Sequence, residues 1–157
     1  WKGYWNRDRS GAATKPLIEN ECRNHLLEKL RDRLVPYHIC IAVPEAQSVE
    51  NTRVDILLQS SNGVNVPIEA KRHFHPDVWS AAETQLQGYA TAQGAEGYGI
   101  YLVFWFGCDY ELTPPVPDKT KKPNTAKEME KMLQDRLPDM MRMQTEVIVF
   151  DVSRQSK

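Results

Sequence analysis

The fold is decided by a stretch in the middle of the chain, RVDILLQSSNGVNVPIEAKR at residues 53–72. Apolar and polar residues alternate on both sides of Ser60-Ser61-Asn62-Gly63, a pattern typical of a β-hairpin. We therefore expect two antiparallel strands, at residues 53–59 and 64–71. Because successive side chains of a strand point to opposite faces, the register of this hairpin decides which side chains lie together.

Two registers are open. With a two-residue turn at Asn62-Gly63, Ile56 would stand opposite Glu69, and both faces would mix apolar with charged residues. With a three-residue loop that ends in a left-handed Gly63, one face becomes apolar and the other polar. We favour this second register because it separates the two kinds of side chain. It pairs Ile56 with Ile68, Leu58 with Val66 and Val54 with Ala70 on the apolar face, and Asp55 with Glu69 and Arg53 with Lys71 on the other.

The polar face of this hairpin carries two carboxylates, Asp55 and Glu69, and the ammonium of Lys71. Like charges directly opposite each other in an antiparallel pair are destabilising unless a cation lies between them. Carboxylate oxygens suit a hard ion such as Mg²⁺, which can acidify a bound water and neutralise charge on a phosphate. Lys71 could orient or deprotonate that water, or stabilise the developing charge. The ordinary alternative is a solvent-facing strand pair decorated with charges.

Glu19 is a further candidate ligand, on a helix expected at residues 17–34. At about 100° per residue, Cys22, Leu26 and Leu30 fall within about 60° of Glu19, whereas Glu21 falls about 160° away. A carboxylate on such an apolar stripe is costly unless it is paired or binds a metal. The alternative is a partly exposed first-turn residue favoured by the helix dipole. Glu45, at the end of the first strand, would replace Glu19 if the helix phase differs.

The remaining elements follow from periodicity and from turn residues. Trp1 to Lys15 is polar and contains glycine, and Pro16 stands where a first helical turn tolerates proline. The order becomes α-β-β-β-α-β-α-β. We expect a first strand at 37–43, a second helix at 78–92, a buried strand at 98–107, a proline- and lysine-rich loop at 112–124, a helix at 125–137 and a last strand at 146–152.

Four other residues are candidate substrate contacts. Gln85 and Tyr89 are four apart on the second helix and share one side of it, where both could hydrogen-bond a phosphate or the lysine. Arg72 follows the Glu-x-Lys strand directly and could bind a phosphate. His73 could also reach substrate, although a histidine in a surface loop is the commoner case.

The overall composition indicates the general class of protein that carries these motifs. The 157 residues are 41% hydrophobic and 26% charged, which predicts one ordinary globular domain. The net charge of −1 does not by itself indicate a nucleic-acid-binding protein. Three cysteines without a C-x-x-C pair favour a reducing cytoplasm, and no apolar run is long enough for a membrane span. The start at Trp1 suggests a module of a longer chain with sensor or regulatory domains elsewhere.

The constellation as a whole resembles the PD-(D/E)XK nuclease superfamily, which has a restriction-endonuclease-like αβββαβ core. In that α/β fold a mixed central sheet is flanked by helices, and this chain would add a C-terminal helix and strand. The superfamily carries a helix glutamate, a strand aspartate and Glu-x-Lys, which Glu19, Asp55 and Glu69-Ala70-Lys71 match. Some branches also carry glutamine and tyrosine four apart, similar to Gln85 and Tyr89. Val54 departs from the motif, where its proline is expected.

The resemblance implies a Mg²⁺-dependent endonuclease that hydrolyses phosphodiester bonds in DNA, with Mn²⁺ able to substitute. Asp55, Glu69 and Glu19 would bind the metal, and Lys71 would complete the catalytic set. A bacterial anti-phage or restriction system would fit such a module, and a homo-oligomer would fit double-strand cutting. RNA remains an alternative substrate, because nothing in the chain reads a 2′-hydroxyl. A degenerate nuclease fold kept for binding, or a general interaction domain, is the alternative function.

Overall fold

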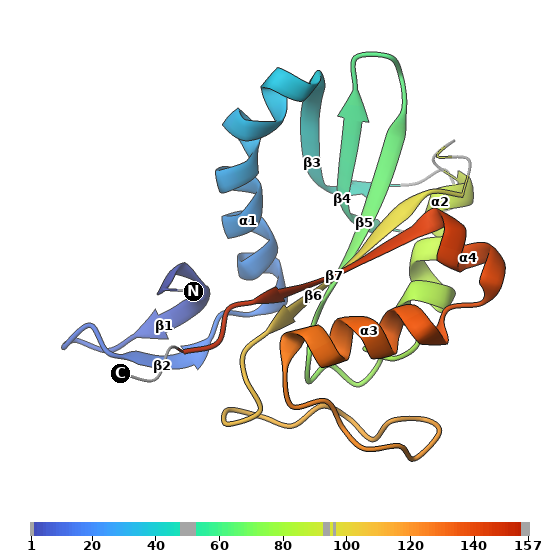
Figure 1. Ribbon diagram of the computed structural model, residues 1–157. Coiled ribbons are helices and arrows are strands. Elements are labelled where there is room, and N and C mark those ends of the chain that lie inside the picture. Colours follow the sequence, from blue (N-terminus) through green and yellow to red (C-terminus); the bar gives the residue numbers. More distant parts are fainter. Residues whose placement is uncertain (1, 48–52, 93–94, 96, 155–157) are drawn as a thin grey trace.

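A mixed β-sheet forms the centre of the fold (Figure 1). The computed structural model describes residues 2–47, 53–92, 95 and 97–154, and of residues 40–47 and 91–92 it describes the backbone. In this part of the chain five strands follow the order β3-β4-β5-β6-β7. The first three are antiparallel and the last three are parallel. Their bounds are β3 Ile39–Gln47, β4 Arg53–Ser60, β5 Asn65–Arg72, β6 Gly99–Trp105 and β7 Thr145–Asp151. The mixed α/β class expected from the sequence is therefore confirmed.

The hairpin of β4 and β5 has the three-residue loop that the sequence favoured. Ile56 pairs with Ile68 and Leu58 with Val66. Gly63 adopts a φ of 84°, the left-handed conformation that glycine tolerates best. The backbone N–H of Ser60 donates to the carbonyl of Val64 at 2.9 Å, closing the loop. The register with a two-residue turn is therefore excluded.

The ladder between β4 and β5 ends at Ile56 and Ile68, earlier than we expected. From there, residues 68–72 pair in parallel with residues 100–104 of β6. The side chain of Asp55 takes the place of a backbone partner, because its Oδ2 accepts a hydrogen bond from the Ala70 N–H at 2.9 Å. The expected pairs of Val54 with Ala70, Asp55 with Glu69 and Arg53 with Lys71 were thus wrong as backbone pairs, since the two strands diverge at this point.

Helices cover the sheet from two sides (Figure 1). Helix α1, Glu19–Leu34, packs Cys22 and Leu27 into a core cluster with Ile56, Ile68 and Leu102. The opposite face packs against the other helices through Tyr101 and Val103 of β6. Those helices are η3 Ala82–Leu86, α2 Gln87–Ala92, α3 Ala126–Arg136 and α4 Asp139–Gln144. The sheet is thus buried on both faces in its centre, where β5 and β6 lie.

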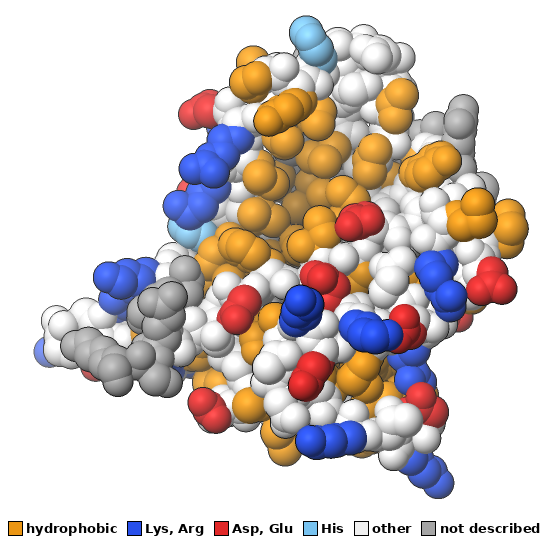
Figure 2. Space-filling view, viewed as in Figure 1, with side chains coloured by type: hydrophobic (Ala, Val, Ile, Leu, Met, Phe, Trp, Pro, Cys, Tyr) orange, Lys and Arg blue, Asp and Glu red, His pale blue; other side chains and the backbone are white. Residues whose placement is uncertain are grey.

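Helix α1 leaves part of its own side of the sheet open. Figure 2 shows apolar side chains gathered in a hollow of the surface beside this helix. On the same face Phe150 of β7 contacts Tyr4 and Phe104 and is 39% exposed, and Ile148 is 38% exposed. The two faces of the sheet therefore differ in how completely helices cover them.

The N-terminal segment, residues 2–16, contains a short helix and a hairpin that its polar composition did not predict. Short η1, Lys2–Tyr4, leads into a hairpin of β1, Trp5–Arg7, and β2, Ala13–Pro16. Trp5 is buried, and its Nε1 donates to the carbonyl of Val152 at 2.7 Å. Pro16 ends this hairpin instead of opening a helix, so α1 begins two residues later than expected. The aromatic residues fix the segment to the body of the protein.

Other parts of the chain also differ from expectation, in element boundaries and in one additional helix. The chain continues past α1 as η2, Val35–Tyr37, and His38 takes a φ of 59°, so β3 starts at Ile39 instead of residue 37. Residues 78–81 precede the second helix, whose first part, η3, is π-helical. Helix α4 was not expected, and it buries Met141 while Met140 and Met143 are exposed. No helix of the described residues is long and apolar enough to cross a membrane.

Candidate active site

The candidate site lies where β4 and β5 diverge, and three elements contribute to it. Glu69 and Lys71 alternate on β5 and are 2% and 6% exposed. The Nζ of Lys71 donates to Glu69 Oε1 and lies 3.8 Å from Glu19 Oε1. Because α1 covers the other face of the sheet, this contact passes through the opening between the two strands. The end of the β4–β5 ladder thus brings together a side chain of helix α1 and two side chains of the sheet, which belong to different layers of the fold.

Glu19 is held in this opening by the backbone of β5. As the first residue of α1, it accepts a hydrogen bond on Oε2 from the N–H of Arg72 at 3.1 Å. Its side chain is 22% exposed. This value lies between the two alternatives from the sequence, a carboxylate buried on the apolar stripe and an exposed residue of the first helical turn. One carboxylate oxygen therefore orients the side chain, and the other faces Lys71.

Asp55 is also held by two partners, one on each oxygen. Its Oδ2 accepts from Ala70 N at 2.9 Å, and its Oδ1 lies 3.2 Å from Nη1 of Arg23. Arg23 is 3% exposed and stands four residues after Glu19 on α1. We did not expect it at the site, although its place between Cys22 and Leu26 on the apolar stripe was a readable signal. A buried guanidinium on such a stripe requires an acidic partner.

Charge in the site is unbalanced. Among the side chains that the structure describes here, Asp55, Glu69 and Glu19 face Lys71 and Arg23, which leaves one more negative than positive charge when all are ionised. Burial and the nearby Asp55 raise the pKa of Glu69 to about 7, even though Lys71 acts in the opposite direction. Burial alone would lower the pKa of Lys71, but the contact with Glu69 and the charges of Glu19 and Asp55 raise it. Lys71 therefore stays an ammonium, while Glu69 resists ionisation.

The donor set fits a hard divalent cation by its chemistry. Asp55, Glu69 and Glu19 supply carboxylate oxygens, which Mg²⁺ prefers, and Mg²⁺ needs only one or two of them besides water and substrate oxygens. A cation would also relieve the excess negative charge. Among the described residues, no three acidic, histidine or cysteine side chains are already arranged around a metal position. In this structure Lys71 contacts Glu69, and Arg23 contacts Asp55.

Tyr89 lies beside the site, whereas Gln85 is not joined to it. Tyr89 is partly buried in α2, and its pKa is raised by burial and by the charges of Glu69 and Asp55. Gln85 is partly buried in η3, and among the described residues no hydrogen bond links it to the acidic side chains. Single π-helical turns are frequent at functional sites, because they re-aim side chains.

Arg72 contributes to the site through its backbone. Its N–H donates to Glu19, but its guanidinium lies 4.7 Å from the centre of the Phe74 ring. Arg72 shares the face of β5 with Ala70, which packs in the same core cluster as Cys22 and Leu27 of α1. A phosphate contact from this side chain would have to come from that face.

His73 is buried within the fold instead of reaching the site. Its Nδ1 accepts from the N–H of Phe106 at 3.2 Å, so its Nε2 is the donor to the carbonyl of Glu111 at 2.7 Å. Burial lowers the pKa of the ring, which keeps it neutral. With both nitrogens bonded to backbone and the ring inaccessible, its surroundings speak against the expected substrate contact.

The alternative acid, Glu45, can be placed by backbone alone. Pro44 pairs with Ile56 and Ala46 with Val54, so position 45 lies across from Asp55 in the ladder of β3 and β4. Its side chain lies outside the described part of the chain. Glu19 is therefore the acid whose contacts are defined.

A cavity of about 350 Å³ lies elsewhere, at the ends of β6 and β7. Trp5, Tyr110 and Asp151 are among the residues that line it, and none of the four candidate catalytic residues does. The chemistry of the candidate site therefore rests on the convergence of charged side chains at the strand opening, and the cavity is a separate feature.

The fold and site define an α/β protein with a buried acid–lysine constellation in a mixed sheet. Residues 2–108 match a protein family described as a domain of unknown function, DUF8371. The chain belongs to this family, and the matched region contains Glu19, Asp55, Glu69 and Lys71. No curated protein matches the chain.

Proposed function

We propose that this protein is a metal-dependent nuclease with a restriction-endonuclease-like core that hydrolyses phosphodiester bonds in DNA. The observation that carries the proposal is the contact of Lys71 with both Glu69 and Glu19 beside Asp55, in the opening between β4 and β5. The element order α1-β3-β4-β5-α2-β6 supports it, because it matches the αβββαβ order of that superfamily. A role as the effector of a bacterial anti-phage or restriction system rests on the resemblance alone.

Burial is what separates this arrangement from surface decoration. Charged pairs on a solvated strand cost little and contribute little, whereas burying ionised groups is expensive even when they are paired. Glu69 and Lys71 are almost fully buried, and the pKa of Glu69 rises to about 7 as a result. Strongly perturbed carboxylates with a specific charge partner cluster at catalytic sites. A structural role alone would be served equally well by apolar residues of similar size.

In this proposal Asp55 and Glu69 hold a divalent cation, with Glu19 as a further ligand or an acid that orients its water. Mg²⁺, or Mn²⁺ in its place, would acidify water and neutralise charge on the scissile phosphate. The residues of the chain do the remaining work. Lys71 keeps its proton, since its pKa is raised, so it stabilises negative charge instead of acting as a base. Tyr89, whose pKa is raised by burial and by the charges of Glu69 and Asp55, is a candidate to orient substrate at this site.

A catalytically degenerate binding module is the second candidate, and one observation favours it. Lys71 and Arg23 contact Glu69 and Asp55 directly, so the acidic residues have protein cations as partners. An acidic site compensated in this way is stable without metal. The two candidates differ in whether divalent cations bind and whether DNA is cut.

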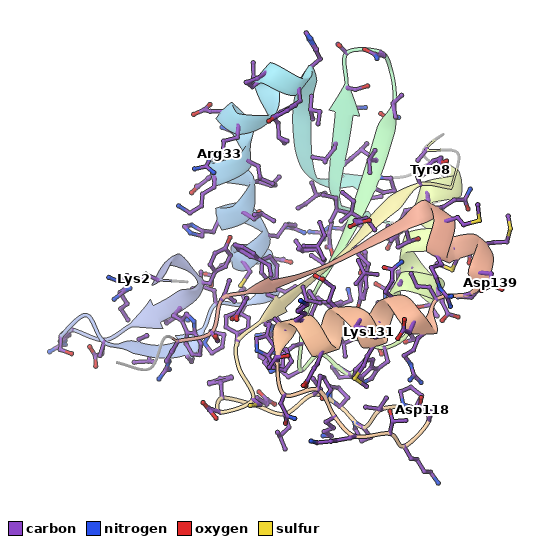
Figure 3. All side chains as sticks on the ribbon, in the orientation of Figure 1. Lys2, Arg33, Tyr98, Asp118, Lys131 and Asp139 are labelled. Atoms are coloured by element: carbon purple, nitrogen blue, oxygen red, sulfur yellow. The ribbon has the colours of Figure 1, made fainter. Side chains whose placement is uncertain are left out.

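The test is cleavage of supercoiled plasmid and of single-stranded DNA and RNA with Mg²⁺, Mn²⁺ or EDTA. The protein is compared with Lys71→Ala, Asp55→Ala and the control Lys131→Ala, whose side chain lies exposed on α3 (Figure 3). Metal-dependent cutting that both site variants lose and the control keeps would support the nuclease. Cutting that persists in both site variants would overturn the site, and metal binding without cutting by any form would favour the binding module.

A further inference from the structure

We propose that Arg23 competes with the divalent cation for Asp55, so that this buried guanidinium weakens metal binding and keeps the site latent at low metal concentration. The inference rests on the proposed function, because it concerns regulation of the same site. It assigns Arg23 a task that neither packing of α1 nor the Glu-x-Lys motif explains.

The geometry divides the two oxygens of Asp55 between two tasks. Oδ2 accepts from the N–H of Ala70 at 2.9 Å, which fixes the carboxylate to β5 without help from Arg23. Oδ1 contacts the Nη1 of Arg23 at 3.2 Å. A cation that binds Asp55 would therefore take over Oδ1, while the bond to Ala70 continues to orient the group. Arg23 is not required as a positioning residue for Asp55.

The charge of Arg23 cannot be removed to make room for a metal. An arginine keeps its proton at any physiological pH, unlike a buried lysine or histidine. Arg23 is 3% exposed, so water screens its charge poorly. A divalent cation on Oδ1 would lie beside this fixed positive charge and would be repelled by it. Metal binding must therefore displace the guanidinium or proceed at reduced affinity.

Lys71 does not duplicate this effect. It contacts Glu69 and Glu19 instead of Asp55, and its flexible stem allows the ammonium to move within the opening. Arg23 is instead a buried residue of α1 itself, directly after the buried Cys22. Removing the charge at position 23 should thus change the affinity for a cation at Asp55 more directly than a change elsewhere on the helix.

The experiment measures thermal unfolding of the protein over a Mn²⁺ titration, with Mg²⁺ in parallel. A ligand that binds only the folded state raises Tm, and at a given concentration the rise grows with the logarithm of its affinity. The variants are Arg23→Gln, the double variant Arg23→Gln with Asp55→Asn, and Arg33→Gln. Arg33 is the matched control, since it is exposed near the end of the same helix on the side away from the sheet (Figure 3).

We expect Arg23→Gln to lower Tm without metal, because Oδ1 of Asp55 loses its cationic partner, and to show a larger rise in Tm with Mn²⁺. The apparent dissociation constant should fall by about tenfold, the scale of one nearby charge in a partly screened site. The double variant should lose this gain, and Arg33→Gln should behave as the unmodified protein. An equal or weaker response of Arg23→Gln would overturn the inference while leaving the nuclease proposal intact.

If neither the unmodified protein nor any variant responds to Mn²⁺ or Mg²⁺, both the inference and the proposed metal site fail. A measurement on the unmodified protein covers the case in which Arg23→Gln does not fold. The NMR signal of the Arg23 Nε–H group should shift as Mg²⁺ is added, and should not shift in Asp55→Asn. A signal that stays unchanged while Mg²⁺ raises Tm would overturn the competition.

Discussion

Asp55 and Ala70 are joined across the point where β4 and β5 part, through the carboxylate of one and the backbone N–H of the other at 2.9 Å. This bond ends the antiparallel ladder and lets β5 continue as a parallel partner of β6. It also holds Asp55 next to Glu69 and Lys71. The same residue is thus a structural joint and a member of the candidate site, so its two roles can be tested separately.

Asp55→Asn and Asp55→Ala are expected to differ in stability. The asparagine can still accept the Ala70 bond, but it removes the negative charge that Asp55 places beside the buried Arg23. The alanine loses both, so its free energy of unfolding should lie lower by about a further 1–3 kcal/mol, the cost of an unsatisfied buried group. Urea denaturation of the three proteins gives these values. Equal stability of the two variants would contradict the structural role of the bond.

Glu69 should make the protein less stable as pH rises. Its pKa is near 7 in the folded protein and about 4.5 in an unconstrained chain, because burial and then Asp55 disfavour the ionised form. Between these values the folded state binds more protons than the unfolded state, so the free energy of unfolding falls with rising pH. The stabilisation is complete below about pH 4.5 and lost above about pH 7, on the order of 3 kcal/mol at about 1.4 kcal/mol per pKa unit.

Urea denaturation in the absence of metal from pH 4.5 to 8 measures this dependence. Glu69→Gln should flatten the profile in that window and be more stable than the unmodified protein at pH 8. Glu21→Gln is the control, since Glu21 lies on the exposed side of α1. Profiles that stay parallel in all three proteins would show that Glu69 ionises normally.

His73 is expected to matter for stability and not for cleavage. Its ring bonds the backbone of Phe106 and Glu111, and both groups would lose their partner in His73→Phe. The free energy of unfolding should fall by about 1–3 kcal/mol for each buried group left unsatisfied. DNA cleavage per folded molecule should stay the same. A selective loss of cleavage, with unfolding unchanged, would restore His73 as a substrate contact.

The hairpin register could be predicted because its physics is local. The alternation of side chains and a glycine at the one position that needs a positive φ determine it together. The divergence of β4 and β5 could not be predicted, since it depends on the pairing of β5 with β6, which lies about thirty residues further along the chain. The periodicity of two strands contains no information about a third.

The placement of Trp5 and Arg23 shows a second limit of the sequence. Trp5 stands in a polar segment, and its burial depends on Phe106 and on the carbonyl of Val152 at the other end of the chain. Arg23 lies on the apolar stripe of α1 in the same way as Glu19, but its partner Asp55 belongs to a strand. The position of Arg23 on the apolar stripe could be read from the sequence, but the partners of both residues could be recognised only from their tertiary neighbours. The four candidate catalytic residues, in contrast, lie in local patterns.

Lys71→Met separates catalysis from metal binding. The methionine keeps an unbranched stem of similar length in the same buried space, but it removes the ammonium from beside Glu69 and Glu19. The site then gains one net negative charge, so the affinity for Mn²⁺ should be equal or higher. Cleavage should fall by about 100-fold or more, the usual cost of a group that stabilises charge in the transition state.

Lys131→Met, on the exposed side of α3, should change neither quantity, because its pair with Asp135 is exposed. Mn²⁺-induced changes in Tm give the first quantity, and plasmid cleavage under saturating Mn²⁺ gives the second. Full cleavage by Lys71→Met would remove Lys71 from the catalytic set, whereas loss of Mn²⁺ binding together with cleavage would assign it a structural role in forming the acidic site.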